Sequence, residues 1–332
     1  MTTAVQCTTA TQWPDWPTYG LVDDLRPTLS RWAQRGDTAA IATLVSIFGS
    51  SPRPLGSEMA IAANGDVAGY VSGGCVEGAV AAEARQVIET GQPVTLDYGA
   101  GSPVLDVQLT CGGRIGIFVR PITDLSAYAA RLQRACDARQ ALDVVIDLES
   151  GQHQFAAAAA QSVRQKGLFR KTYMPLPRLL VIGSDPITVA LARLAPQFGF
   201  EVGLLRPYGP SAPPDGVSTF HYDTRPIVRA LADVPIDAHT AVYTLTHNIE
   251  DDQEVLLRAL RSPAFAVGVL GSRTKIKERS HLLAAAGIDD NDMARLNTPA
   301  GIDIGARNPT EIALSILAEL VSKRPRAIRA AA

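Results

Sequence analysis

The sequence predicts an α/β protein in which a mixed α+β domain is followed by a parallel-sheet domain. The chain of 332 residues is 46% hydrophobic, so it can bury real cores, and it exceeds the commonest single-domain size. Beyond residue 178, strand and helix signals alternate strictly, which is typical of a parallel sheet covered on both faces. The preceding segment, 164–178, is basic and contains two prolines. We therefore expect domains at 18–163 and 179–326, joined by a linker at 164–178.

The elements of the first domain follow from local composition. Residues 38–48 are rich in β-branched and apolar side chains and predict a buried strand. Asn64 and Gly65 tolerate the positive φ angles of a tight hairpin turn, and the alanine-rich segment 76–89 favours a helix. In chain order the expected elements are a helix at 23–34, strands at 38–48, 59–63 and 66–71, a helix at 76–89, strands at 94–98 and 114–120, a helix at 125–138, and strands at 142–148 and 154–158.

The second domain begins with a short aliphatic run, 179–183, that ends in glycine and predicts the first strand of a βαβ unit. Asn308 and Pro309 suit the N-cap and first position of a final amphipathic helix. The expected strands are 179–183, 199–205, 241–245 and 264–270, and the expected helices are 187–198, 251–260, 274–286 and 309–323.

Charge and cysteine usage exclude several classes of protein. The formal net charge is -2 and no basic stripe is present, so neither nucleic acid nor an anionic membrane is an expected partner. The apolar runs are too short for a bilayer span. Four cysteines without regular spacing or an export signal favour a reducing compartment, and we expect the cytoplasm.

Two cysteines lie against paired glycines, at residues 72–78 and 110–113. Glycines let the backbone bend sharply and let a ligand approach, so Cys75 and Cys111 are interpreted as thiols presented to a ligand. Cys75 precedes the predicted helix at 76–89, where the positive end of the helix favours a thiolate. The alternative is that both are small residues at the edge of a core.

The other cysteines and the nearby acids carry weaker signals. Cys7 and Cys136 are interpreted as incidental. Glu58 and Glu77 are candidate acids or bases near Cys75, with surface or capping roles as equal alternatives.

The turn after residue 182 stands where a dinucleotide-binding fold carries its phosphate loop. It contains Gly183 but lacks the three spaced glycines of that fingerprint, and Asp185 is expected to face a pyrophosphate with negative charge. Arg206 stands where an acid would hold the adenine ribose. NAD(P) is therefore not an expected cofactor, although Arg206 weakly favours a phosphorylated ligand.

Further candidates follow the later strands, because open α/β sheets bind ligands at the carboxyl ends of their strands. His247 is a candidate site residue, or else a local packing or capping residue. Gly271, Ser272 and Arg273 form a glycine turn that suits an anion, or else a capped helix with solvated cations. Gly305 is a candidate ligand edge before the last helix.

Taken together, six collinear segments resemble the XdhC/CoxI family of xanthine dehydrogenase accessory proteins. They are residues 49–56, 72–77, 111–113, 246–247, 270–273 and 301–306. The resemblance implies a Rossmann-like second domain and a chaperone that binds molybdenum cofactor. It further implies that the protein supports sulfuration of the cofactor and delivers it to a molybdenum hydroxylase client. The family's usual Gly-Ala-Gly-His type turn is here replaced by residues 184–186.

The cofactor that the resemblance implies is a phosphorylated pterin, molybdopterin or its dinucleotide form, with a molybdenum centre. Soft thiolates suit the metal or a transferred sulfur, and glycine turns and helix starts suit the phosphate. The residues expected to contact it are Gly73, Gly74, Cys75, Glu77, Cys111, His247, Gly271, Ser272, Arg273 and Gly305. We expect Cys75 and Cys111 to face a cleft between the domains near the molybdenum.

The expected partners, besides the client, are a cysteine desulfurase and a cofactor nucleotidyltransferase, with a homodimer as the default assembly. Two other functions stay open. One is a nucleotide-dependent oxidoreductase that uses the second domain, and the other is a cofactor-free assembly scaffold. The sequence favours a chaperone over a catalyst.

Overall fold

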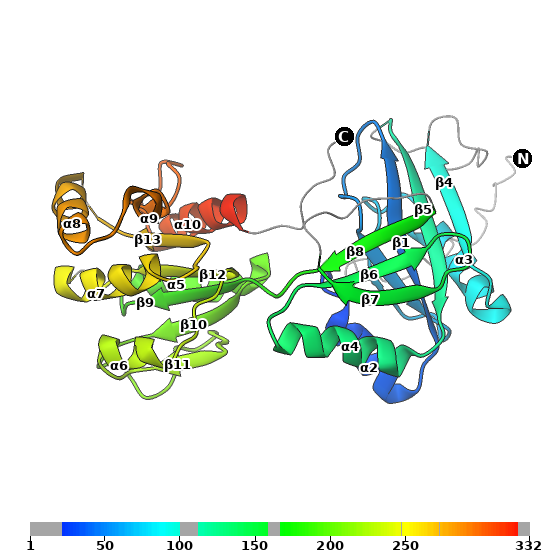
Figure 1. Ribbon diagram of the computed structural model, residues 1–332, viewed down its shortest axis with the longest axis horizontal. Coiled ribbons are helices and arrows are strands. Elements are labelled where there is room, and N and C mark those ends of the chain that lie inside the picture. The colour runs from blue at the N-terminus through cyan, green and yellow to red at the C-terminus, as the bar shows by residue number, and fades with distance from the viewer. Residues whose placement is uncertain (1–21, 100–111, 159–166, 247, 272, 325–332) are drawn as a thin grey trace, which may run out of the picture. The chain divides into compact units, whose positions relative to one another are not determined.

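The computed structural model describes residues 22–99, 112–158, 167–246, 248–271 and 273–324, and for residues 273–275 it describes the backbone alone (Figure 1). The chain divides into two compact units between Met174 and Pro175. Each unit has its own sheets and its own cores.

The first unit contains a five-stranded antiparallel sheet in the order β3-β2-β1-β5-β4. Its strands are β1 (Ala39–Phe48), β2 (Glu58–Ala62), β3 (Val67–Gly69), β4 (Val94–Gly99) and β5 (Arg114–Ile122). The predicted hairpin is confirmed, since Ile61 pairs with Val67 across the Asn64–Gly65 turn. Helix α3 (Glu77–Thr90) covers one face and packs its buried Val80, Ala84 and Val87 on the strands.

A second, three-stranded sheet and two helices enclose the other core of this unit. The sheet has the order β7-β6-β8 and consists of β6 (Leu142–Asp147), β7 (His153–Ala157) and β8 (Leu168–Tyr173). Helices α2 (Arg26–Arg35) and α4 (Leu125–Asp137) pack on each other and contribute Leu29, Trp32, Tyr128 and Leu132 to this core.

Strand β8 lies inside the range 164–178 that the sequence analysis assigns to a linker. Its basic composition suggests a solvated connector, but Arg170 and Thr172 both donate to the buried carboxylate of Asp143, at 2.8 and 2.6 Å. The paired carboxylate explains why a charged segment forms a strand here. The connector between the units is correspondingly shorter than the sequence suggests.

The second unit is a six-stranded parallel sheet in the order β11-β10-β9-β12-β13-β14. Numbered within the unit this order is 3-2-1-4-5-6, that of a Rossmann fold. The strands are β9 (Arg178–Ile182), β10 (Glu201–Leu205), β11 (His221–Asp223), β12 (Thr240–Thr244), β13 (Ala266–Val269) and β14 (Leu296–Asn297). The predicted α/β class with a parallel-sheet second domain is confirmed.

Helices cover both faces of this sheet. They are α5 (Pro186–Leu194), the 3-10 helix η1 (Ala195–Phe198), α6 (Ile227–Ala232), α7 (Ile249–Leu260), α8 (Arg273–Ala285), α9 (Asp290–Met293) and α10 (Pro309–Lys323). Helices α5 and α10 build the core on one face, and α6, α7 and α8 build the other. Among the helices described, none is both long and apolar enough to cross a membrane. Because every strand is parallel, the turns that follow β9, β12 and β13 meet at one edge of the sheet.

Candidate functional site

The loops that the sequence singles out in the first unit are neighbours where the inner strands β1 and β5 of the antiparallel sheet end and begin. Phe48, the last residue of β1, pairs with Arg114 at the start of β5. A Cβ atom added to Gly113 would collide with the carbonyl oxygen of Ser50, so only glycine fits at this crossing. The structure therefore places residues 112–113 directly against the loop that follows β1.

The loop before α3 touches the same loop from another side. A Cβ atom added to Gly73 would lie 3.4 Å from Cγ of Pro52. Segments 49–56, 72–77 and 112–113, which are far apart along the chain, thus form one cluster, named here the thiol edge. Phe48 is 65% exposed there, which is unusual for an aromatic side chain at a strand end.

Glu77 organises the thiol edge from within. Its side chain is 1% exposed and accepts hydrogen bonds from the backbone N–H groups of Ser72 at 2.7 Å and of Val71 and Val76 at 3.2 Å. The Ser72 hydroxyl donates to the same carboxylate at 2.7 Å. Of the two roles left open for Glu77, this geometry favours capping over that of an acid or base beside Cys75, because the carboxylate oxygens accept hydrogen bonds from the chain itself.

The backbone of Cys75 joins this network. Its backbone N–H donates to the Ser72 hydroxyl oxygen at 3.2 Å, and its side chain is exposed. Gly74 has a φ of 104°, a conformation that favours glycine, and the space around an added Cβ atom is open. Cys75 is therefore an exposed residue just before the first turn of α3, at the helix start that the sequence predicts.

Cys111 lies outside the described residues. The described residue nearest to it in the chain, Gly112, has a φ of 69° and open space around an added Cβ atom. The cysteine in α4, Cys136, is partly buried.

Glu58 belongs to the opposite face of the sheet, which corrects its expected place near Cys75. Side chains alternate along β2, so that Met59 and Ile61 pack under α3 whereas Ala60 packs on the core of α2 and α4. Glu58 shares the second face, where its Oε2 accepts a hydrogen bond of 2.6 Å from Tyr173. Burial and the Glu58 carboxylate hold the pKa of the Tyr173 hydroxyl well above its usual range, so this hydroxyl stays a donor.

The sequence analysis missed a buried polar network on that face. Arg120 is 0% exposed, donates to the Tyr128 hydroxyl at 3.2 Å and lies 3.3 Å from Nδ1 of His153. Burial, with the Arg120 charge as a second cause, lowers the pKa of His153 to about 4, so the ring is neutral and can accept. An arginine inside an otherwise apolar strand was the signal that could have revealed this network.

The turn between β9 and α5 in the second unit is closed by its own carboxylate. Asp185 is the N-cap of α5, and its Oδ1 accepts from the backbone N–H and the hydroxyl of Thr188, both at 2.7 Å. A Cβ atom on Gly183 would lie 2.7 Å from the Leu245 carbonyl oxygen, which explains the glycine. Asp185 was expected to repel a pyrophosphate at this turn; it instead takes the helix-start N–H group that would bind one.

The turns after β12 and β13 are tied together by a buried ion pair. Asp252 of α7 and Arg279 of α8 are 1% and 2% exposed, and a terminal nitrogen of Arg279 donates to Asp252. Of the predicted residues in these turns, His247 and Ser272 lie outside the described part of the chain. Gly271 follows β13 directly, and the backbone of Arg273 begins α8.

Gly305 belongs to the loop before α10. Its φ is 72°, and its N–H donates to the Asp303 side chain at 3.1 Å. A cavity of about 790 Å³ lies between the start of α5 and the start of α10. It is lined by Ser184, Asp185, Pro186, Val189, Ala190, Arg193, Leu194, Asn308, Pro309 and Thr310. The altered turn at 184–186 and the start of α10 therefore share one cavity.

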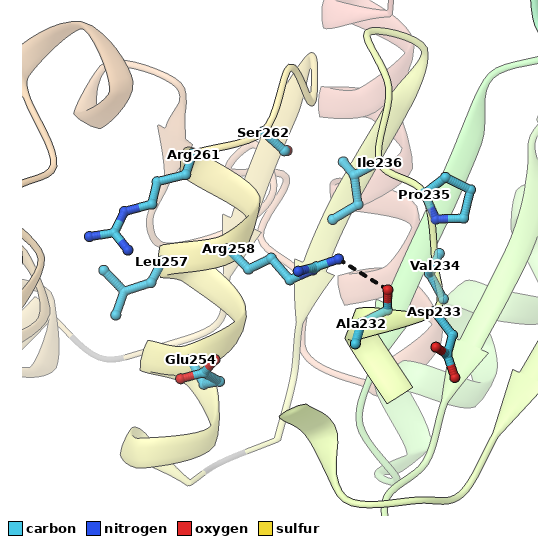
Figure 2. A pocket seen from close by; sticks show the side chains of 10 residues that line it. All are labelled: Ala232, Asp233, Val234, Pro235, Ile236, Glu254, Leu257, Arg258, Arg261 and Ser262. Atoms are coloured by element: carbon cyan, nitrogen blue, oxygen red, sulfur yellow. Dashed lines mark hydrogen bonds between the residues drawn. The ribbon is translucent and has the colours of Figure 1, made fainter. Parts of the chain in front are cut away.

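A second cavity, of about 660 Å³, lies between the loop after α6 and the C-terminal half of α7 (Figure 2). Arg258 reaches across it toward the Ala232 carbonyl oxygen, 3.4 Å away, and Arg261 donates to the Ala286 carbonyl at 2.8 Å. Both guanidinium groups thus serve backbone carbonyls. This cavity lies at the other end of α7 from Asn248, away from the turns that the sequence singles out.

The fold and the thiol edge define a class of protein: a Rossmann-ordered domain preceded by a mixed antiparallel domain that presents a thiol at a helix start. Comparison with known proteins narrows this class. The family described as "XdhC and CoxI family" matches residues 32–99, and the one described as "XdhC Rossmann domain" matches residues 179–320. The chain belongs to the XdhC/CoxI family, as its sequence motifs predict.

Two relatives and one solved structure extend the match along the chain. The molybdenum cofactor insertion chaperone PaoD of Escherichia coli (strain K12) is 30% identical over 308 residues, which is 92% of this chain and 90% of that protein. A probable xanthine dehydrogenase subunit of Bacillus subtilis (strain 168) is 26% identical over 87% of this chain and 94% of that protein. A crystal structure described as a xanthine dehydrogenase from Bacillus halodurans has the same fold, with a TM-score of 0.74 and 24% sequence identity. The match covers 90% of this chain and 94% of that chain.

Proposed function

We propose that this protein binds molybdenum cofactor, supports its sulfuration and delivers it to a molybdenum hydroxylase of the xanthine dehydrogenase type. The observation that carries the proposal is the exposed Cys75 thiol, held at the start of α3 by a loop whose polar groups are satisfied from within. Support from outside the chain comes from PaoD, the relative named as a molybdenum cofactor insertion chaperone.

The thiol edge suits the soft end of this cargo. Cys75 lies just before α3, and a cysteine sulfur is a soft ligand for molybdenum or for a sulfur bound to it. The backbone at Gly74 leaves room for a close approach, because nothing lies within 4 Å of an added Cβ atom there. Cys111 is proposed as the second thiol. Glu77 acts indirectly, because its buried carboxylate holds the loop that presents Cys75.

The phosphate end of the cargo is assigned to the turns of the second unit. Gly271, Ser272 and Arg273 are the proposed phosphate contacts, and His247 and Gly305 are proposed to border them. The first turn of α8 contains no acidic residue, whereas that of α7 contains three. An anion is therefore favoured at the start of α8 rather than at the start of α7.

The sulfur donor and the nucleotide supply follow from this function. A cysteine desulfurase and a cofactor nucleotidyltransferase are the proposed partners besides the client, in the cytoplasm, where thiols stay reduced. A homodimer is the proposed assembly.

The test is cofactor retention by a cysteine variant. The unaltered protein, Cys75→Ala and the matched control Cys136→Ala are purified from a host that makes the cofactor, and bound molybdenum and pterin fluorescence are measured. We expect Cys75→Ala to lose most of the bound cofactor and of client activation, and Cys136→Ala to keep both. Full retention and activation by Cys75→Ala would refute the role of the thiol edge.

The second candidate, a nucleotide-dependent oxidoreductase, is favoured by the Rossmann strand order. It is disfavoured by Asp185, which caps α5 where a pyrophosphate would bind. Equilibrium dialysis with NAD separates the two, since saturable binding to the unaltered protein would support the oxidoreductase. A protein that binds neither NAD nor molybdopterin would support the cofactor-free scaffold.

A further inference from the structure

We propose that Asp252 and Arg279 are positioning residues that hold the ends of β12 and β13 in one fixed arrangement, so that the turns beyond them bind the phosphate end of the cofactor as a unit. This inference rests on the proposed function, because it concerns the same site. The hydrogen bonds of one buried ion pair carry it.

Asp252 fixes the turn that follows β12. Its Oδ1 accepts hydrogen bonds from the hydroxyls of Thr244 at 2.6 Å and Thr246 at 2.8 Å. Thr244 is the last residue of β12, and the Thr246 oxygen also accepts from the N–H of Asn248 at 3.2 Å. Asn248 is the N-cap of α7. A single carboxylate oxygen therefore holds the strand end and is linked through Thr246 to the helix start at Asn248.

Arg279 extends this arrangement to the next strand. One of its terminal nitrogens donates to Oδ2 of Asp252, and the other donates to the Leu270 carbonyl at 2.6 Å. Leu270 directly follows β13 and precedes Gly271. Because a guanidinium holds its donors in a rigid planar fork, the two contacts set the distance between the β13 turn and Asp252.

The location of the pair argues for a role beyond stability. A buried ion pair adds little net stability, because desolvation offsets most of the attraction, and well-packed apolar residues often stabilise a fold as well. This pair lies at the carboxyl edge of the parallel sheet, where open α/β folds bind ligands. It ties together the two turns that carry the proposed phosphate contacts.

The first unit supplies a matched control. Asp143 is 0% exposed and accepts from a threonine hydroxyl, that of Thr172 at 2.6 Å, and from Arg170 at 2.8 Å. Its donors are of the same kinds as those of Asp252, but it lies inside the three-stranded sheet of the other unit. Substitution of Asp143 thus reproduces the loss of a buried, hydrogen-bonded carboxylate without touching the turns, and its partner Arg170 is 30% exposed.

The experiment compares Asp252→Asn, Arg279→Gln and Arg279→Lys with Asp143→Asn. Hydrogen exchange is measured on peptides that contain Thr246 or Leu270, and affinity is measured by fluorescence titration with molybdopterin released from a purified molybdoenzyme. We expect Asp252→Asn to speed exchange at Leu270, which Asp252 does not contact. We likewise expect Arg279→Gln to speed exchange at Thr246, which Arg279 does not contact. Affinity should fall about tenfold in both variants, within the range for residues that act through others. Asp143→Asn should change neither quantity.

Each outcome decides between the proposals. The positioning role would be overturned if exchange became faster only in the turn that the substituted residue contacts. It would also be overturned if the variants bound molybdopterin as tightly as Asp143→Asn does. Either result would leave the proposed function intact. Failure of the unaltered protein to bind molybdopterin would overturn both. Arg279→Lys keeps the positive charge but cannot bind both the Leu270 carbonyl and Asp252. If the other variants do not fold, this variant should show the same faster exchange and weaker binding.

Discussion

Helices α3 and α5 begin in similar ways and differ in what they leave exposed. Each follows a turn that contains glycine, and at each a carboxylate of the chain accepts from the backbone, from three N–H groups at Glu77 and from one at Asp185. Glu77 folds back onto residues before its helix and leaves the Cys75 thiol outside. Asp185 caps its own helix and lines a cavity. An internal carboxylate at a glycine turn thus either takes the N–H group of the helix start, as Asp185 does, or holds the loop and leaves a neighbouring residue exposed, as Glu77 does.

The largest effect that tests this comparison is expected at Glu77. Glu77→Ala leaves three backbone N–H groups and the Ser72 hydroxyl without their carboxylate in a buried loop. We expect the free energy of unfolding of the first unit to fall by about 3 kcal/mol, as measured by urea unfolding. The exposed Glu89 in the same helix is the control, and Glu89→Ala should change stability by less than about 0.5 kcal/mol. Equal effects of the two substitutions would contradict the internal role of Glu77.

A smaller effect is expected at Asp185, whose carboxylate serves one N–H group and one hydroxyl. Asp185→Ala removes the N-cap of α5 and should cost about 1 kcal/mol in urea unfolding of the second unit. Asp185→Asn keeps a good N-cap and should cost almost nothing. If the asparagine variant lost as much stability as the alanine variant, charge rather than capping would be the role of Asp185.

The effect that is smallest at neutral pH concerns a polar group that the fold keeps neutral, in contrast to both carboxylates. The pKa of His153 is lowered to about 4, whereas unfolded histidine titrates near its ordinary value of 6.5. The unfolded state therefore binds the proton first as the pH falls, and stability should decline between about pH 6.5 and pH 4. His153→Phe should show a smaller decline over this range in thermal unfolding. Identical pH profiles would show that His153 contributes nothing to acid sensitivity.

The long elements of the fold were predictable, and the short ones were not. Helix α10 has the predicted bounds, 309–323, because Asn308 and Pro309 mark its start and apolar residues mark one face. Strand β11 and helix α6 have 3 and 6 residues, too few for a periodic pattern to register. Strand β8 was missed because its basic residues find acidic partners only in the folded unit.

The helix start beside Cys75 was predictable, whereas the internal contacts of its loop were not. Two glycine-flanked cysteines indicated the thiol edge, and the helix start beside Cys75 followed from local composition. That Glu77 fills its own loop depends on the path of residues 71–76 in three dimensions. That Glu58 faces away from Cys75 depends on which face of the sheet α3 covers. Neither fact is present in local spacing.

Strand β8 bears on how this protein can be cut into separate parts. It is the last strand before the boundary at Met174, and two of its residues brace segments of the neighbouring sheet: Lys171 donates to the Gly56 carbonyl at 2.5 Å and Tyr173 to Glu58 at 2.6 Å. A truncation after residue 163 would remove both of these contacts, one of which is to the loop of residues 49–56. A cut after Met174 keeps them, so expression of an isolated N-terminal half should end there.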